Sequence, residues 1–148
     1  MPTHYEGSEE EVSSLNAYIK LMRAANAVTR RLTPTIAASG LTLSQFGVLE
    51  ALHHVGPMCQ RELSDKLLLS GGNITMVVNN LEKQGLVVRL RTGSDRRYST
   101  VHLTWRGTQM IKEVFPKHLK EIIRVFSVLQ MEDLDSFGKS CKSVGKGV

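Results

Sequence analysis

Four arginines and one aspartate lie within the 16 residues RLRTGSDRRYSTVHLT, from Arg89 to Thr104. Guanidinium groups form planar, paired hydrogen bonds with phosphate and carboxylate oxygens, so such a cluster is suited to a polyanion. The surrounding segment is also basic, because Glu82 to Arg106 contains six basic and two acidic residues, a local charge of +4 in a chain of net charge +5. This concentration predicts a polyanionic partner, although a solvated surface can carry the same charge.

Asp95 interrupts this basic segment, and its position is compatible with two roles. A carboxylate two residues before Arg97 can pair with that guanidinium and hold its planar fork in one orientation. The stretch Gly93-Ser94-Asp95 also contains the residue types that favour a turn. We therefore expect Asp95 to orient Arg97, to build the turn, or to do both.

Length and composition indicate a globular protein without a disulfide framework. The chain has 148 residues, which suits one domain or one domain with an extension, and 41% of them are hydrophobic. Its two cysteines, Cys59 and Cys141, fit a reducing compartment. The N-terminus shows no signal-peptide pattern, and no stretch approaches the ~20 apolar residues of a membrane span. We expect a cytoplasmic protein without a membrane partner.

The first half of the chain is predicted to be helical. Between residues 9 and 40 apolar side chains recur every three or four positions, and Pro34 ends or kinks this long helix. Thr42 and Gln45 form a T-x-x-Q capping box that opens a second helix, which Gly56 and the following proline stop. In this second helix we expect four apolar side chains to face inward: Phe46, Leu49, Leu52 and Val55.

Two shorter helices are predicted on either side of the turn Ser70-Gly71-Gly72-Asn73, in which Ser70 is a candidate N-cap. The first carries Leu63 and Leu67, and the second ends at Gly85. The side chains that we expect the second to bury are Ile74, Val77, Val78 and Leu81.

A hairpin and two more helices complete the predicted elements. Residues 86–91 and 98–103 have the patterning of two strands joined by a longer loop. Thr104 then caps a long helix, with Pro116 as a candidate kink. A last helix around Leu134 and Phe137 is followed by a tail of lysines and glycines.

This order of elements, two short helices and then a hairpin, is that of a winged helix-turn-helix. The second helix of such a pair presents its outer face to the major groove of DNA. Amides, a hydroxyl and a methionine suit the edges of bases, whereas an ordinary solvated face usually carries more charge than one lysine in six positions. The outer face is expected to consist of Asn73, Thr75, Met76, Asn79, Asn80 and Lys83.

Three segments, LTLSQFGVLEAL, LSDKLLLSGGNITMVVNNLEKQGLVVR and DRRYSTVHLTWRG, resemble the MarR family of bacterial transcription regulators. The resemblance covers about residues 12–140 and places the family's D-x-R wing signature on Asp95 and Arg97. It implies a mainly α fold with a small β-hairpin wing, in which the first and last helices interlock in a dimer. The implied parts are an N-terminal dimerisation helix (9–40), a winged helix-turn-helix DNA-binding lobe (41–104) and C-terminal dimerisation helices (105–144).

The resemblance implies a sequence-specific regulator that binds double-stranded DNA as a homodimer. We expect a repressor that a small aromatic ligand releases from a palindromic operator. In the family, basic residues often stand near the positions of Met76 and Asn80, so their absence here shifts affinity toward the wing. The predicted DNA-binding residues are Ser70, Asn73, Thr75, Met76, Asn79, Asn80, Lys83, Arg89, Arg91, Asp95, Arg96 and Arg97.

The family's effector site, between the dimerisation helices and the lobe, implies a second set of residues. Aromatic, polarizable and hydrogen-bonding side chains at such a junction suit a small aromatic ligand, although each of them could simply pack in a core. The predicted ligand-binding residues are Tyr18, Met22, Phe46, His53 and Phe115.

The sequence features speak against two other classes of function. A winged-helix module for protein contacts, without direct base readout, would more often expose a contiguous apolar patch on residues 73–83. An enzyme would need a nucleophile–base pair, a phosphate-cradling loop or a metal-ligand spacing, and the sequence shows none of them. We therefore expect no enzymatic activity, no cofactor and no metal site.

Overall fold

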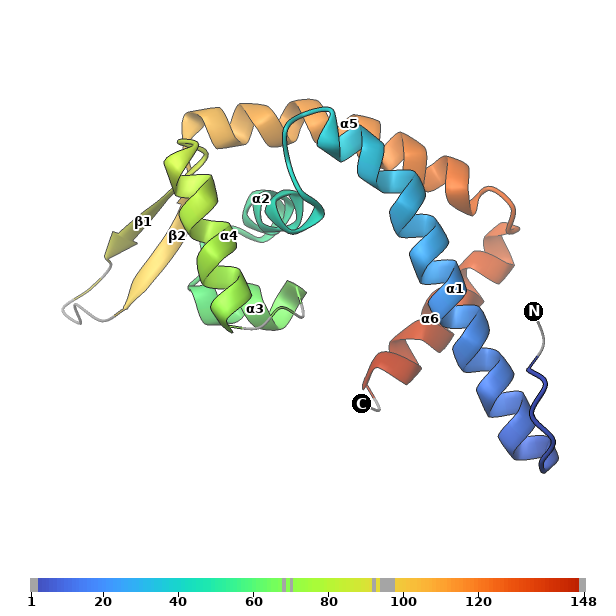
Figure 1. Ribbon diagram of the computed structural model, residues 1–148. Coiled ribbons are helices and arrows are strands. Elements are labelled where there is room, and N and C mark those ends of the chain that lie inside the picture. The colour runs from blue at the N-terminus through green and yellow to red at the C-terminus, as the bar shows by residue number, and fades with distance from the viewer. Residues whose placement is uncertain (1–2, 68, 70, 92, 94–97, 147–148) are drawn as a thin grey trace. The chain divides into compact units, whose positions relative to one another are not determined.

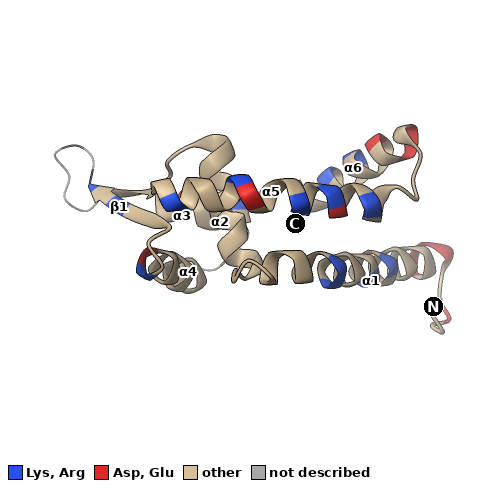
Figure 2. Ribbon diagram, turned by 90° about the horizontal axis from the view of Figure 1, so that it is seen from above, with Lys and Arg blue, Asp and Glu red and all other residues tan. Residues whose placement is uncertain are grey.

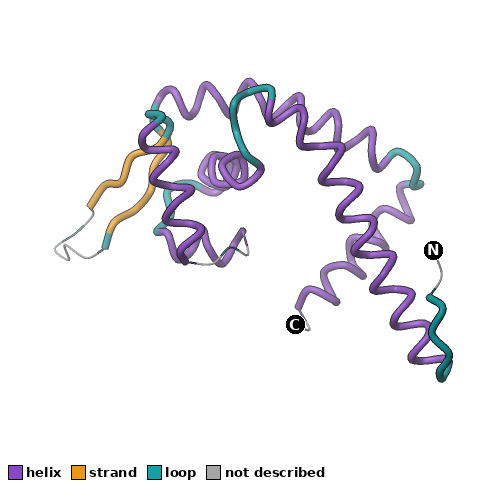
Figure 3. Tube along the Cα trace, viewed as in Figure 1, coloured by secondary structure: helices purple, strands orange, loops and turns teal. Residues whose placement is uncertain are grey.

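The computed structural model describes residues 3–67, 69, 71–91, 93 and 98–146. Most of the described chain is helical, and the strands form one antiparallel hairpin (Figures 1 and 3). The elements are α1 (Glu9–Ala37), α2 (Leu43–Val55), α3 (Gln60–Leu67), α4 (Gly71–Lys83), β1 (Val87–Arg91), β2 (Ser99–Leu103), α5 (Trp105–Phe126) and α6 (Met131–Lys146).

The chain divides into two compact units. Unit 1 combines Met1–Leu32 with Lys120–Val148, and unit 2 is Thr33–Leu119. Both predicted domain boundaries, after residue 40 and after residue 104, fall inside unit 2. The first half of α5 therefore belongs to the same compact unit as the helices and hairpin that precede it.

Unit 2 has a closed apolar core. Helix α2 packs against α3, α4 and β2, while α4 also packs against α3 and β1. Most of the predicted inward-facing side chains are buried in this core, but Val55 is exposed and Val77 is only half-buried. The prediction for Val55 was wrong because this residue ends α2, and at Gly56 (φ 109°) the chain turns away. The fully buried side chains include Phe46, Leu49, Leu63, Ile74, Val78, Leu81, Val101 and Ile111.

Local caps fix the ends of the helices in unit 2. The predicted capping box is present, because the Gln45 backbone N–H donates to Thr42 Oγ1 (3.1 Å) and the Thr42 backbone N–H donates to Gln45 Oε1 (3.0 Å). At the start of α5 the Gly107 N–H donates to Thr104 Oγ1 (3.0 Å), as predicted for a cap. The same hydroxyl donates to the carbonyl oxygen of Gly85 (2.7 Å), which links the end of α4 to the start of α5.

The hairpin begins one residue later in each strand than predicted, and its register runs from Val87 opposite Leu103 to Arg91 opposite Ser99. Met58 extends this ladder, since its backbone exchanges hydrogen bonds with Val101. Figure 1 shows the hairpin beside α4. The strands also contact the helices of unit 2, β1 through α4 and β2 through α2.

Two helices continue where the sequence predicted a break or a tail. Pro34 lies inside α1, which ends only at Ala37, and α6 extends to Lys146 through the predicted tail of lysines and glycines. Pro116 likewise lies inside α5. No helix in the described ranges is both long enough and apolar enough to cross a membrane.

Unit 1 consists of helical segments whose apolar side chains are largely uncovered in the single chain. The first turn of α1 is acidic and contains Glu9, Glu10 and Glu11. Figure 2 shows these acidic residues in red near the N-terminus. Helix α6 has no buried residue among those described. The large exposed apolar side chains of unit 1 are Tyr5, Tyr18, Leu21, Met22, Ile123, Val128, Met131, Phe137 and Val144.

Candidate nucleic-acid interface

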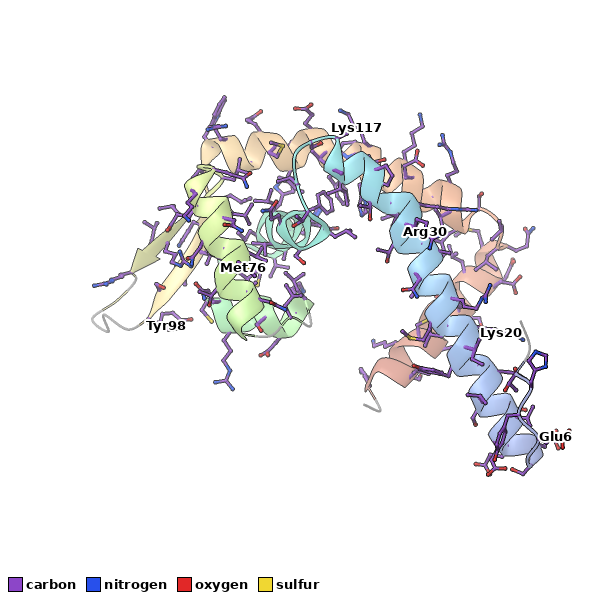
Figure 4. All side chains as sticks on the ribbon, in the orientation of Figure 1. Glu6, Lys20, Arg30, Met76, Tyr98 and Lys117 are labelled. Atoms are coloured by element: carbon purple, nitrogen blue, oxygen red, sulfur yellow. The ribbon has the colours of Figure 1, made fainter. Side chains whose placement is uncertain are left out.

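The outer face of α4 presents the residues that the sequence predicted. Ile74, Val78 and Leu81 point into the core, because they recur at helical spacing on the opposite side. Figure 4 labels Met76, which is 57% exposed although it is apolar. All six predicted outer-face residues are exposed: Asn73, Thr75, Met76, Asn79, Asn80 and Lys83.

A shallow hollow adjoins this face. It has a volume of about 350 Å³ and lies between the start of α2 and α4, with Ser44 and Leu69 on one side and Met76 and Asn80 on the other. Three amides (Gln45, Asn73 and Asn80) and a thioether therefore border a concave surface rather than a flat one. Such a surface can accept a protruding group, for example the methyl of a thymine.

The wing contributes fewer described residues. Arg91 is exposed at the end of β1, opposite Ser99. Four predicted DNA-binding residues lie outside the described residues: Ser70, Asp95, Arg96 and Arg97. The pairing of Asp95 with Arg97 therefore stays a prediction.

Arg89 differs from Arg91, because all three of its side-chain nitrogens donate within the protein. Its Nε donates to Gln60 Oε1 (2.9 Å), its Nη1 to Glu82 Oε1 (3.0 Å) and its Nη2 to Asn79 Oδ1 (2.6 Å). The backbone N–H of Arg89 also donates to Glu82 Oε2 (3.2 Å). The side chain is only 23% exposed. Arg89 thus connects β1 to both α3 and α4.

A second set of bonds extends this network across the helix-turn-helix. Gln60 Nε2 donates to Thr75 Oγ1 (3.1 Å), and the Thr75 hydroxyl donates to the carbonyl oxygen of Gly71 (2.9 Å). Gln60 therefore uses both ends of its amide inside the protein. We name the five residues Gln60, Thr75, Asn79, Glu82 and Arg89 the Arg89 network.

Tyr98 precedes β2 and is half-exposed (Figure 4). The nearby Cys59 and Glu62 side chains raise the pKa of the Tyr98 phenol, since negative charge next to it disfavours the phenolate. At neutral pH this phenol is protonated, as an ordinary tyrosine also is, and it can donate a hydrogen bond.

These features were compared with known proteins. The model of the MarR family matches residues 39–97. The HTH-type transcriptional regulator MhqR of Bacillus subtilis is 35% identical over 132 residues, which cover 89% of this chain and 91% of that protein. This chain belongs to the MarR family. Its relatives are transcriptional regulators, and the family is not one of enzymes.

Solved structures share the fold of this MarR-family chain. The regulator Sco3205 from Streptomyces coelicolor, solved in complex with DNA, has a TM-score of 0.85 and 22% identity, covering 97% of this chain and 91% of that chain. NadR, solved in complex with 4-hydroxyphenylacetate, has a TM-score of 0.77 and 23% identity, covering 99% of both chains. Both likenesses confirm the predicted winged helix-turn-helix.

The predicted ligand-binding residues of this MarR-family chain are divided between its two units. Tyr18 and Met22 lie on α1 in unit 1, where both are exposed in the single chain. The other three belong to unit 2, in which Phe46 is fully buried, while His53 and Phe115 are half-buried. Their role in binding a ligand stays a prediction.

The sequence did not indicate that His118, in unit 2, would be buried. His118 lies against the ring of Phe46, with 4.6 Å between the ring centroids. Burial lowers the pKa of His118, an effect that the negative charge of Glu50 partly opposes. Its Nδ1 is buried and has no hydrogen-bond partner within the described part of the chain. Burial therefore favours the neutral form of this imidazole.

Sequence reasoning also missed Gln60 and Glu82 as members of the interface. Both are polar residues of helices that the sequence placed correctly. Gln60 contacts Arg89 across 29 positions of the chain, and Glu82 contacts it across 7. The one available signal was local: Glu82 is the acidic residue at the start of the basic segment. Nothing in the sequence of α3 indicates that Gln60 faces β1.

Proposed function

We propose that this chain is a homodimeric transcriptional repressor that binds double-stranded DNA in a sequence-specific manner. The observation that carries the proposal is the outer face of α4, which exposes three asparagines, a threonine, a methionine and one lysine. Uncharged hydrogen-bonding groups read base edges, whereas a helix that bound only phosphates would carry more cations. The DNA complex of Sco3205, which has the same fold, supports this assignment.

Each part of the lobe has its own role in this proposal. Helix α4 enters the major groove, and its exposed amides and Met76 contact bases. The hairpin lies along the phosphate backbone, where Arg91 and the arginines at residues 96 and 97 supply positive charge, while Asp95 orients Arg97. The Ser70 hydroxyl, next to the start of α4, contacts a phosphate.

The dimer interface is formed by apolar side chains drawn from residues 9–40 and 105–144. The single chain leaves apolar side chains of unit 1 in solvent, and an apolar groove of about 530 Å³ follows α5 and α6, with Phe126 and Phe137 among its walls. Such a surface is stable when a second copy covers it. A two-fold dimer would bind a palindrome whose half-site centres are about 10 base pairs apart.

A small aromatic molecule would release the repressor. The complex of NadR with 4-hydroxyphenylacetate supports a ligand of this class. We assign its contacts to Tyr18, Met22, Phe46, His53 and Phe115, which combine aromatic, thioether and imidazole groups. Release requires that the ligand bind more tightly to the conformation that cannot hold DNA, because equal affinity for both conformations would change nothing.

A scan of overlapping duplexes from the DNA upstream of the protein's own gene tests the proposal. One duplex should shift at nanomolar protein in a gel assay with competitor DNA, and Asn80→Ala should weaken this shift more than it weakens binding to a scrambled duplex. Lys117→Ala is the matched control, because Lys117 is exposed on α5 and pairs with Glu113 (3.6 Å). Equal binding to every duplex, or none, would instead favour a protein-interaction module.

A further inference from the structure

We propose that Arg89 is a positioning residue that holds the Asn79 amide with its Nδ2 toward the DNA. As a result, Asn79 selects a base that presents acceptors, guanine or thymine, over adenine or cytosine. This inference rests on the proposed function, in which α4 reads the major groove. It assigns Arg89 a role inside the protein in place of the phosphate contact that its charge alone predicts.

The geometry around Arg89 fixes the guanidinium in one orientation. Three acceptors from three residues surround it, at 2.9 Å (Gln60), 3.0 Å (Glu82) and 2.6 Å (Asn79). A guanidinium is planar and its donors diverge at set angles, so three simultaneous bonds leave it no freedom to rotate. The Arg89 backbone N–H also donates to the Glu82 carboxylate at 3.2 Å, so three hydrogen bonds tie Arg89 to α4.

The fixed guanidinium in turn decides which end of the Asn79 amide faces outward. The Asn79 oxygen accepts from a cation, and such charge-assisted hydrogen bonds are about twice as strong as neutral ones. If the amide rotated by half a turn, its NH₂ group would face the N–H groups of Arg89, and two donors would meet. The oxygen therefore stays toward Arg89, and Nδ2, with two N–H donors, is the group available to a ligand.

This orientation has a consequence for base recognition. An asparagine reads adenine by accepting from N6 and donating to N7 at the same time. At Asn79 the oxygen already accepts from Arg89, so the amino group of adenine or cytosine would approach the N–H donors of the guanidinium, and donors would face donors. Guanine presents O6 and N7, and thymine presents O4, and all of these accept from Nδ2.

Asn80 provides the contrast within the same helix turn. Its side chain is exposed and makes no hydrogen bond to any residue in the described ranges. Its amide can rotate to suit either a donor or an acceptor. Neighbouring residues of the same type are therefore expected to have different base preferences, and the difference arises from Arg89.

Selection of binding sites from a randomised duplex library tests the inference. The library should be enriched with the wild-type protein, Asn79→Ala, Arg89→Met and Arg89→Lys, with Arg106→Met as the control that removes the same charge from the start of α5. The position that loses its preference in Asn79→Ala identifies the base that Asn79 reads. We expect guanine or thymine there for the wild type and for Arg106→Met. Both Arg89 variants should accept adenine at that position, with the preference against it falling about tenfold.

The salt dependence of binding separates positioning from a phosphate contact. A residue that neutralises one phosphate lowers the slope of log affinity against log salt concentration by about one when it is removed. We expect the slope of Arg89→Met to equal that of the wild type. Circular dichroism and a thermal melt establish that each variant is folded. If Arg89→Met is unstable, Arg89→Lys takes its place, because lysine retains a cation that can pair with Glu82.

Three results would overturn the inference while leaving DNA binding intact. These are adenine at the Asn79 position in the wild type, an unchanged base preference in both folded Arg89 variants, and a salt slope reduced by about one in Arg89→Met. Failure of the wild type to enrich any sequence would instead overturn the proposed function, and this inference with it.

Discussion

In unit 2 the large apolar side chains close over one another, whereas in unit 1 many of them face solvent in the single chain. Phe46, Leu49 and Leu63 are 0–2% exposed in unit 2, but Ile123 in unit 1 is 61% exposed. Both units obtain their helices from the same kind of three-and-four spacing. The difference teaches that amphipathic periodicity predicts a buried face without revealing whether the same chain or another molecule buries it.

The comparison makes opposite predictions for a glycine in each unit. A Cβ at Gly107 would lie 2.0 Å from the backbone oxygen of Leu86, which cannot move without shifting the strand that follows, whereas a Cβ at Gly138 meets nothing within 4 Å. Gly107→Ala should therefore destabilise the protein by about 3 kcal/mol or more, as severe overpacking does. Gly138→Ala should be neutral or stabilise it by up to about 1 kcal/mol, because alanine favours a helix.

Urea unfolding monitored by circular dichroism gives both free energies. Equal and small effects of the two substitutions would show that α5 does not approach the hairpin as closely as the structure indicates. The contrast between a closed unit 2 and an open unit 1 would then be lost.

A charge placed on the uncovered surface tests what covers unit 1. Ile123→Asp should convert the dimer into monomers, because each copy would lose about 1.5–3 kcal/mol of apolar burial and gain a buried carboxylate, twice per two-fold interface. Gln109→Asp, which adds the same single negative charge at an exposed position of α5 in unit 2, is the control for charge. Light scattering at micromolar concentration measures the mass. A wild type that is monomeric, or an Ile123→Asp variant that stays dimeric, would contradict a dimer built on this surface.

The smallest expected effect concerns His118 in the core of unit 2. Burial lowers the pKa of His118 below its ordinary value of 6.5. Below pH 6.5, His118 therefore takes up a proton more readily in the unfolded chain than in the folded chain. The contribution of neutral His118 to the unfolding free energy is fully present above pH 6.5, and it decreases as the pH falls below 6.5. His118→Leu should flatten the dependence of the unfolding free energy on pH between 7 and 5.

The matched control for this titration is His102→Leu, because His102 lies half-buried on β2 outside the contact with Phe46. Parallel pH profiles for the wild type and His118→Leu would contradict a neutral, desolvated imidazole at position 118.

Local signals in the sequence predicted the fold well where the controlling contacts are local. Thr42 and Gln45 are three residues apart, and their capping box forms as predicted. Gly85, with φ of 73°, ends the helix that it was expected to end. The helix ends expected at Pro34 and at the lysine- and glycine-containing tail were predicted less well. A helix continues through such residues where the neighbouring turns supply enough hydrogen bonds.

Contacts between distant residues could not be predicted in the same way. The charge of Arg89 suggests a phosphate contact, and only the fold brings Gln60, 29 positions earlier in the chain, to its Nε. Arg89 and Arg91 are identical in type and point to the same face of one strand, yet one is enclosed by acceptors and the other is exposed. The sequence shows how many charged residues a segment contains, but it does not show which acceptors bind them.

The most direct test of the central claim is a comparison of two affinities of the wild-type protein. Fluorescence anisotropy at 150 mM salt should measure its dissociation constants for a duplex enriched from the library and for a scrambled duplex of equal length. If α4 reads bases, the enriched duplex should bind at least about 10³-fold more tightly, as specific sites do. Equal dissociation constants for the two duplexes would contradict the claim that this chain recognises DNA by sequence.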